Sequence, residues 1–426
     1  MTWFSILVLA LLLLKWAAQL WLERLNRRAA LSHSDHVPET FRGIIDDATY
    51  RKTVEYTLAK GKLHQVELTY HTMVLLAILF SGVLAWVFEI FHIHFGGSVW
   101  SMAAFLLLIG LALALPGLPF DWYDQFRLEE RFGFNTTTPR TWWLDRTKGV
   151  VLAVVLGYPL LVFILKLAEW SGAWWWFWAW AALLSFQCVM AVLAPVLILP
   201  LFNKFSPLPA GELRARLLAL AARTQFRAQS IQVMDGSKRS RHSNAFFTGF
   251  GRLRKIVLFD TLIQQLAEGE LEAVLAHEIG HYKKGHIPKM LAASALGSLA
   301  LFYLLSRLAT HAWFYESFRF QPGNLVPALL LFGLLSGVLT FWVSPLVHAW
   351  SRRYEYQADA FASEVMNGPE ALIGALRKLN EKNLSNLTPH PLYSGFYYSH
   401  PTLIEREQAL RLPGGSDGGR AQMATA

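Results

Sequence analysis

Residues 174–201 read WWWFWAWAALLSFQCVMAVLAPVLILPL and contain no charged side chain. An apolar stretch of about 20 residues is long enough to cross the hydrocarbon core of a bilayer as a helix. The sequence predicts seven such spans, because six more stretches have the same character. The first of them is interpreted as a retained anchor and not as a cleaved signal peptide, because it is long, contains Lys15 and lacks a basic region before it. The six are 2–22, 71–91, 100–118, 149–168, 288–308 and 325–350.

The overall composition agrees with a membrane protein. Of the 426 residues, 54% are hydrophobic and only 16% are charged, against about 25% charged residues in soluble domains. This composition excludes a disordered chain and a collagen-like chain. The single cysteine, Cys188, cannot form an internal disulfide, which excludes a disulfide scaffold as well.

The basic residues alternate between the connecting segments and predict an orientation in the membrane. The segments after spans one, three, five and seven carry 8, 5, 13 and 8 Lys and Arg residues, whereas those after spans two, four and six carry 0, 0 and 1. The positive-inside rule then puts the N-terminus outside and the C-terminus in the cytoplasm. The formal charge of +9 is explained by cytoplasmic loops facing anionic lipids, so no nucleic-acid partner is expected. Short outer loops and spans rich in Ala, Leu and Trp favour a bacterial inner membrane.

We therefore expect a mostly α-helical polytopic membrane protein with two soluble segments on the cytoplasmic side. Chemistry that needs water belongs in those segments or in a cavity that opens to them. The predicted parts are 1–201 with spans one to five, 202–287, 288–350 with spans six and seven, 351–412, and a disordered tail over 413–426.

The strongest local motif is His277-Glu278-Ile279-Gly280-His281, which has the form H-E-x-x-H. It follows a run of good helix formers, and on a helix the two histidines share one face and can bind one Zn²⁺. Glu278 lies one residue further round, where it can take a proton from water whose pKa zinc has lowered. Gly280 weakens a helix by about 1 kcal/mol, which a close approach of another element would explain. The alternative is an ordinary amphipathic helix with surface histidines.

A catalytic zinc site needs a third protein ligand. The residue six positions after the motif is Ile287, so the metzincin pattern, which requires a histidine there, is absent. His286 is interpreted as a non-ligand, because it lies off the ligand face. Within 352–362, Glu355 can be the third ligand, and Asp359, four residues later, can orient a ligand histidine. The alternative is a solvated face of salt bridges.

These motifs and several others resemble the Ste24-type membrane zinc metalloproteases of peptidase family M48, also called CAAX prenyl protease 1. The resemblance implies a barrel of seven tilted helices around a large water-filled chamber, with the zinc site on the cytoplasmic side. The further similar stretches are EERFGFN at 129–135, PLFNKFSPL at 200–208, SNAFFTGF at 243–250, KIVLFDTL at 255–262, and SHPT at 399–402 followed by Glu405 and Arg406.

The resemblance also implies roles for individual residues. His277, His281 and Glu355 would bind one zinc ion per chain. Glu278 would act as general base and then as proton donor. Asp359 would support a ligand histidine from behind.

Four more residues receive roles only through the resemblance. His400 and Arg406 would act near the developing oxyanion or in substrate positioning, since a peptidase needs a donor for that charge. Asn244 and Ala245 would offer a strand edge to an extended substrate. Residues 245–250 are aromatic and β-prone, and a buried strand is the alternative.

The sequence thus predicts an integral membrane zinc endopeptidase that acts as a monomer on peptide or protein substrates. These substrates are expected to be prenylated CAAX proteins or other membrane-associated proteins. Two alternatives remain: a quality-control protease for misfolded membrane proteins, and a seven-helix transporter without enzymatic activity. Few ionisable residues lie within the spans, which counts against transport.

Overall fold

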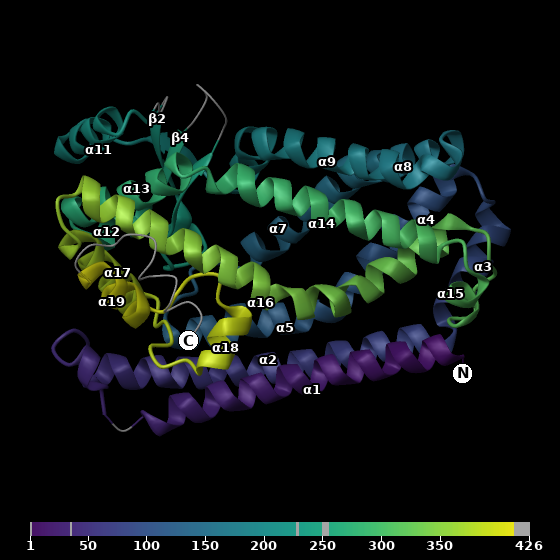
Figure 1. Ribbon diagram of the computed structural model, residues 1–426, viewed down its shortest axis with the longest axis horizontal. Coiled ribbons are helices and arrows are strands. Elements are labelled where there is room, and N and C mark those ends of the chain that lie inside the picture. Colours follow the sequence, from purple (N-terminus) through teal and green to yellow (C-terminus); the bar gives the residue numbers. More distant parts are fainter. Residues whose placement is uncertain (1, 35, 227–229, 249–254, 413–426) are drawn as a thin grey trace.

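The protein is an elongated bundle of long helices, with a small sheet and several short helices at one end (Figure 1). The computed structural model describes residues 2–34, 36–226, 230–248 and 255–412. Within these residues, seven helical stretches are long and apolar enough to cross a membrane, which confirms the predicted number of spans. They are Trp3–Ser32, Asp47–Ser81, Val99–Phe132, Pro139–Trp170, Gly172–Phe202, His286–Leu308 and Leu325–Val365.

The first five spans are built from long helices and shorter segments. Three of the stretches contain a π-helical turn, the last of them next to Pro195. The helices are α1 (Trp3–Ser32), α2 (Asp47–Ser81), α3 (Val83–Phe95), α4 (Val99–Ala114), α5 (Leu118–Tyr123), α6 (Glu130–Phe132), α7 (Pro139–Leu152), α8 (Tyr158–Trp170), α9 (Trp175–Leu193) and α10 (Leu199–Phe202).

The predicted bounds of the second span, 71–91, are wrong. The helix α2 begins at Asp47, where the side chain of Asp46 accepts hydrogen bonds from the backbone N–H groups of Ala48 and Thr49. It ends at Ser81, because Gly82 adopts a left-handed conformation with φ of 85° and α3 starts after it. An apolar stretch does not reveal either end of this helix. The first half of α2 is polar, and the apolar α3 continues the stretch beyond Gly82.

The second half of the chain carries the remaining helices and one sheet of four strands. The strands lie in the order β1-β2-β4-β3, and only β2 and β4 are parallel. The elements are β1 (Phe205–Pro207), α11 (Glu212–Arg223), β2 (Ser230–Met234), β3 (Ala245–Thr248), β4 (Lys255–Phe259), α12 (Asp260–Gln265), α13 (Glu268–Lys283), α14 (His286–Leu308), α15 (Ala312–Glu316), α16 (Leu325–Val365), α17 (Glu370–Lys382), α18 (Pro391–Tyr397) and α19 (Leu403–Arg411).

Among the described residues, the strand β3 lies at an edge of the sheet and pairs only with β4. This confirms the predicted strand over 245–248 and makes the buried-strand alternative wrong for these residues. The rest of that prediction, 249–250, and the predicted disordered tail, 413–426, lie outside the described residues.

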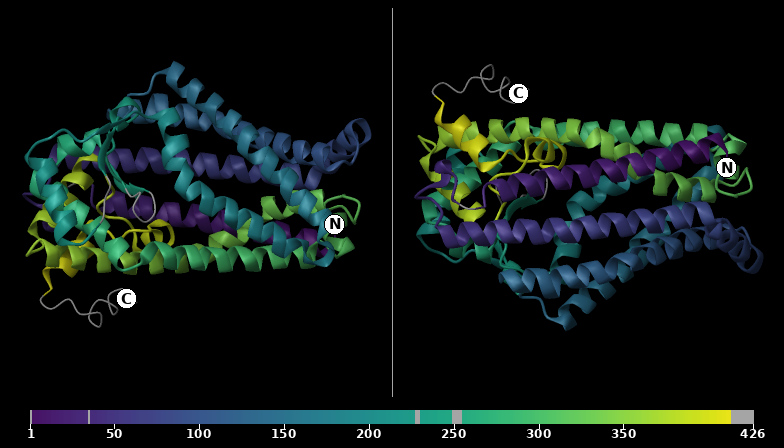
Figure 2. Two further views of the ribbon diagram at one scale, coloured as in Figure 1. Left: turned by 90° about the horizontal axis from the view of Figure 1, so that it is seen from above. Right: turned by 90° about the horizontal axis from the view of Figure 1, so that it is seen from below.

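The seventh span does not stop where the hydropathy falls. The helix α16 continues unbroken through the predicted boundary at 350 and carries Glu355 and Asp359 on its last turns. It also contains Pro345, which neighbouring helices make tolerable in a membrane span. One rigid element thus leads from the spans to the predicted third ligand. Figure 2 shows from two further sides that the long helices run along the length of the molecule, with the N-terminus at the end away from the C-terminal helices.

A hydrophobic core fixes α13 against the sheet and the C-terminal helices. Leu271, Leu275 and Ile279 of α13 are almost completely buried, together with Ile256 and Leu258 of β4. Burying one such side chain stabilises a fold by about 1.5–3 kcal/mol. The apolar face of α13 is therefore held by packing, and its opposite face is turned toward α16.

Candidate metal centre

The helices α13 and α16 cross at a very short separation. A Cβ atom added at Gly280 would lie 3.0 Å from Cα and 3.1 Å from the carbonyl oxygen of Ala358. These are backbone atoms, which cannot move aside, so only glycine allows this approach. The close approach expected from the sequence is therefore present at Gly280, and it brings the H-E-x-x-H motif against the later acidic residues.

The crossing brings three possible metal ligands together. The Nε2 atom of His277 lies 3.2 Å from Nε2 of His281 and 3.5 Å from Oε2 of Glu355. His281 Nε2 lies 3.3 Å from Oε1 of the same glutamate. Ligands of a tetrahedral zinc ion at about 2.0–2.2 Å from the metal are themselves about 3.3 Å apart. The three side chains therefore have the spacing and the chemistry of a His₂Glu zinc site.

Burial supports the same interpretation. His277 and Glu355 are only 7% and 3% exposed. The Oε2 atom of Glu355 is buried and makes no well-aligned hydrogen bond among the described residues. A cation at this position would satisfy a buried carboxylate oxygen that lacks a well-aligned hydrogen bond.

Asp359 supports His277 from the side away from the other ligands. Its Oδ1 atom lies 2.8 Å from His277 Nδ1, which leaves Nε2 directed toward Glu355. Arg406 donates two hydrogen bonds to the same carboxylate, of 2.8 and 2.5 Å. Burial alone would lower the pKa of His277, but hydrogen bonds to Asp359 and Glu355 raise it to about 9. The imidazole is thus held in one orientation by a buried ion pair.

A second histidine supports His281 in the same way, and the sequence did not predict it. His286 is 1% exposed, and its Nδ1 lies 3.0 Å from Nδ1 of His281. Its other nitrogen lies 2.9 Å from the side-chain oxygen of Gln357, and its ring stacks on Tyr354. The ligand cluster found among the described residues does not include His286, and its role as a non-ligand stays a prediction. The sequence offered one signal for this contact: Gln357, a polar partner for His286, lies between the two predicted acidic residues Glu355 and Asp359.

Glu278 is the carboxylate of the motif that is not part of the ligand cluster. Within the described part of the chain its side chain makes no hydrogen bond or ion pair. Burial raises the pKa of its carboxyl group, while His277 and His281 oppose that shift. A raised pKa brings a carboxylate closer to the range in which it exchanges protons at neutral pH.

The residues whose roles were implied only by the resemblance differ in how exposed they are. His400 is mostly exposed, and its Nδ1 lies 2.8 Å from Oε2 of Glu355, so it borders the ligand cluster. Arg406 is 9% exposed; it donates two hydrogen bonds to Asp359, and its remaining terminal nitrogen lies 3.8 Å from Oε2 of Glu355. Asn244 and Ala245 begin the edge strand β3, which packs near α13.

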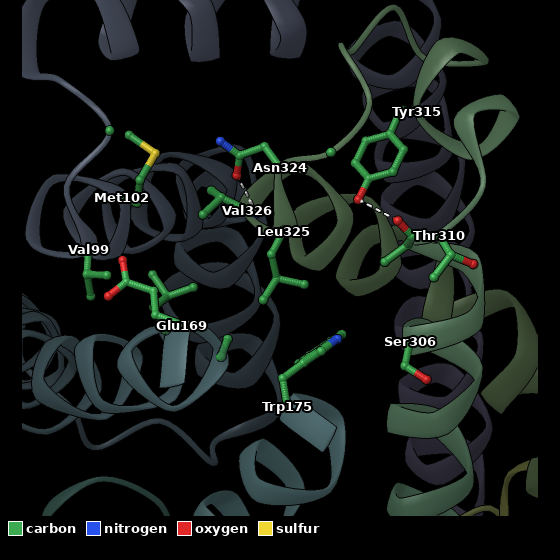
Figure 3. A pocket seen from close by; sticks show the side chains of 15 residues that line it. Val99, Met102, Glu169, Trp175, Ser306, Thr310, Tyr315, Asn324, Leu325 and Val326 are labelled. Atoms are coloured by element: carbon green, nitrogen blue, oxygen red, sulfur yellow. Dashed lines mark hydrogen bonds between the residues drawn. The ribbon is translucent and has the colours of Figure 1, made fainter. Parts of the chain in front are cut away.

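The other end of the bundle holds a separate hollow of about 340 Å³ (Figure 3). It lies where α14 ends and α16 begins, with Glu169, Trp175, Ser306 and Asn324 around it. Along α16, residues 325 and 355 are about 45 Å apart at 1.5 Å per residue. Among the described residues its lining includes no histidine, and it lies at the other end of the bundle from the metal cluster.

Seven spans and a buried His-His-Glu cluster with a neighbouring free carboxylate define a class of protein, the membrane-embedded metallopeptidases. Comparison with known proteins points to one family within this class. A family model described as "CAAX prenyl protease N-terminal, five membrane helices" matches residues 26–204, and the model of peptidase family M48 matches residues 207–413.

Individual relatives give the same result. The CAAX prenyl protease 1 homolog of Arabidopsis thaliana is 36% identical over 384 residues, covering 88% of this chain and 90% of the relative. The CAAX prenyl protease 1 of Saccharomyces cerevisiae is 36% identical over 403 residues, covering 88% of each chain. The crystal structure of S. mikatae Ste24p superposes with a TM-score of 0.88 at 33% identity, covering 96% of this chain and 99% of that one.

The chain therefore belongs to peptidase family M48, in the group of Ste24-type CAAX prenyl proteases. It is an integral membrane zinc metalloprotease with a mostly α-helical fold of seven spans and a metalloprotease domain, as the sequence predicted. Family membership excludes the alternative of a transporter without enzymatic activity.

Proposed function

We propose that His277, His281 and Glu355 bind one zinc ion in each chain. The observation that carries this proposal is the 3.2–3.5 Å spacing of their ligand atoms, which suits a tetrahedral ion. A single chain supplies all three ligands, which supports a monomer as the active unit.

The surrounding side chains then have separate tasks in peptide hydrolysis. Bound zinc supplies Lewis acidity, which lowers the pKa of water to about 7. Glu278 accepts the proton of the attacking water and returns it to the leaving amine, because it is close to the ligands and unpaired. Asp359 keeps His277 in the tautomer that presents Nε2 to the metal, and Arg406 acts as a positioning residue by holding Asp359.

His400 is the candidate donor to the carbonyl oxygen on which negative charge develops. It borders Glu355 and is mostly exposed, unlike Arg406, which is buried and donates two hydrogen bonds to Asp359. A donor in this position stabilises the transition state more than the ground state.

The edge strand β3 supports a role in holding the substrate. Within the part of the chain that the structure describes, no strand pairs with its other side, and an extended peptide can add to such an edge as a further strand. The strand begins at Ala245, directly after Asn244, so both proposed substrate-binding residues lie at the start of this edge.

The proposed substrates are prenylated CAAX peptides. The named relatives are CAAX prenyl proteases, and the match spans nearly their whole length. The purified protein in lipid nanodiscs should cleave a farnesylated CAAX peptide much faster than the same peptide without the farnesyl group. Equal rates on both peptides would favour the quality-control alternative, and Glu278→Gln is the control for a contaminating protease.

In the proposed orientation, the protein lies in a bacterial inner membrane, and its metal cluster and C-terminus face the cytoplasm. The alternation of basic loops supports it, and the loops between spans on the other side are short. The exposed Arg214 of α11, changed to Cys in a Cys188→Ala background, should resist a membrane-impermeant thiol reagent in intact cells. Ready labelling would show that this position faces the outside, which would contradict the proposed orientation.

A further inference from the structure

A polar cavity of about 330 Å³ lies between α1, α2 and the segment that follows α17. It is lined by residues from all three elements, and none of them belongs to the proposed metal centre. Residues of the wall include Glu23, Tyr56, Gly61, His64, Tyr393 and Tyr398.

Glu23 is a buried carboxylate with one oxygen available to this cavity. The residue is 2% exposed, and its Oε1 atom receives both of its hydrogen bonds, from Nδ1 of His64 at 2.6 Å and from the hydroxyl of Tyr393 at 3.1 Å. Oε2 has no hydrogen bond among the described residues. It lies against Gly61, where an added Cβ would be 3.3 Å away. An oxygen in this position can accept a charge-assisted hydrogen bond from a ligand in the cavity.

Among the described residues of the cavity wall, no lysine or arginine is free to pair with Oε2 of Glu23. Lys60 is in the wall, but its ammonium group already contacts Asp124 at 2.8 Å and Glu129 at 2.6 Å. Two carboxylates therefore share one lysine, and among the described residues the printed partners of Glu23 and Glu129 that can add positive charge are the partly exposed His64 and His242. Acidic oxygens and tyrosine rings together make a site that favours a cation.

One residue of the cavity wall contacts the segment that precedes the edge strand proposed for substrate binding. Asn383 belongs to its wall, and the Oδ1 atom of this residue lies 3.0 Å from Nδ1 of His242 and 3.4 Å from the backbone nitrogen of Ser243. The strand β3 begins at Ala245, two residues later, which is about 7 Å along an extended chain. A peptide that pairs with β3 and continues past Ser243 reaches this wall.

We propose that the cavity binds a basic side chain, Lys or Arg, of the polypeptide substrate. The ammonium or guanidinium group would donate to Oε2 of Glu23, and the tyrosine rings would surround its aliphatic part. This inference rests on the proposed function, because it takes the substrate to lie along β3.

The test uses a neutral peptide substrate into which a single Lys is introduced at successive positions, with Gln at the same position as reference. In the wild type, one position should lower KM by about tenfold relative to Gln, with kcat unchanged, as expected for one charge-assisted hydrogen bond. In Glu23→Gln this preference should fall below about twofold. The matched control is Glu55→Gln, the same change at an exposed carboxylate of α2, which should keep the preference.

A second variant covers the case in which Glu23→Gln does not fold. Gly61→Ala keeps every charge but places a methyl group against Oε2, and it should weaken the Lys preference as well. Direct binding of fluorescent Lys and Gln peptides to protein carrying Glu278→Gln measures the same preference without turnover. A wild type that cleaves Lys and Gln peptides equally at every position would overturn this inference alone. A wild type that cleaves no peptide would overturn the proposed function with it.

Discussion

The α13–α16 crossing and the cavity beside α1 both bury carboxylates, but they are built differently. At the crossing, four carboxylate or imidazole groups come from two helices, each group one turn from the next on its own helix. In the cavity, Glu23 accepts hydrogen bonds from His64, which is 41 residues away in the sequence, and from Tyr393, which is 370 residues away. Helical spacing makes the first site readable in the sequence, whereas only the tertiary fold creates the second.

The two regions also differ in how completely their carboxylates are satisfied. Asp359 uses both oxygens, one on His277 and Arg406 and the other on Arg406 alone. Glu23 uses one oxygen and leaves the other toward a cavity. A saturated carboxylate fixes its neighbours, and an unsaturated one can take up a ligand. The experiments below separate these two uses.

The largest effect is expected for Glu278→Gln. The amide has nearly the same size but cannot accept a proton, so peptide cleavage should fall by roughly 10² to 10⁴-fold. Zinc content should stay at the wild-type level, because Glu278 lies outside the ligand cluster. Steady-state kinetics and metal analysis of the same sample check both parts, and turnover close to wild type would refute the role of Glu278 as base.

The saturated and unsaturated carboxylates should differ in their effect on zinc. Asp359→Asn removes the charge that orients His277, so zinc affinity should fall by about 10 to 100-fold, and high zinc should restore activity. Glu23→Gln should leave zinc affinity unchanged. Competition with a chelating indicator measures both constants, and equal losses in the two variants would mean that the regions are coupled.

A smaller effect, on stability, distinguishes two glycines. Gly280→Ala forces a methyl group against backbone atoms of Ala358 and should cost about 1–3 kcal/mol. Gly61→Ala meets only the movable end of Glu23 and gains up to about 1 kcal/mol in helix propensity, so its net change should be close to zero. Thermal unfolding in one detergent compares them, and a Gly61→Ala protein less stable than Gly280→Ala would contradict the account of the crossing.

Local signals in the sequence predicted much of the fold. Seven apolar stretches gave the correct number of spans, and the aromatic, β-prone run gave the strand over 245–248. Two features were not predicted, because they depend on single residues or on packing. Gly82 breaks the second span through its left-handed conformation, and α16 stays helical beyond 350 because α13 packs against its polar end.

The site shows the same division. The spacing of His277, His281, Glu355 and Asp359 predicted a cluster that the structure brings together, and Gly280 predicted the close crossing. The contact of His286 with His281 and the pairing of Arg406 with Asp359 were not predicted from spacing. Both join elements that a helical period cannot relate, so only the folded chain reveals them.

The zinc content of the purified protein tests the central claim most directly. Mass spectrometry of metals in wild type and in His281→Ala, purified side by side without added metal, gives the number of ions per chain. The α13–α16 crossing predicts one zinc in the wild type and close to none in the variant, because one of three protein ligands is lost. One zinc in both proteins would contradict the assignment of this cluster as the metal centre.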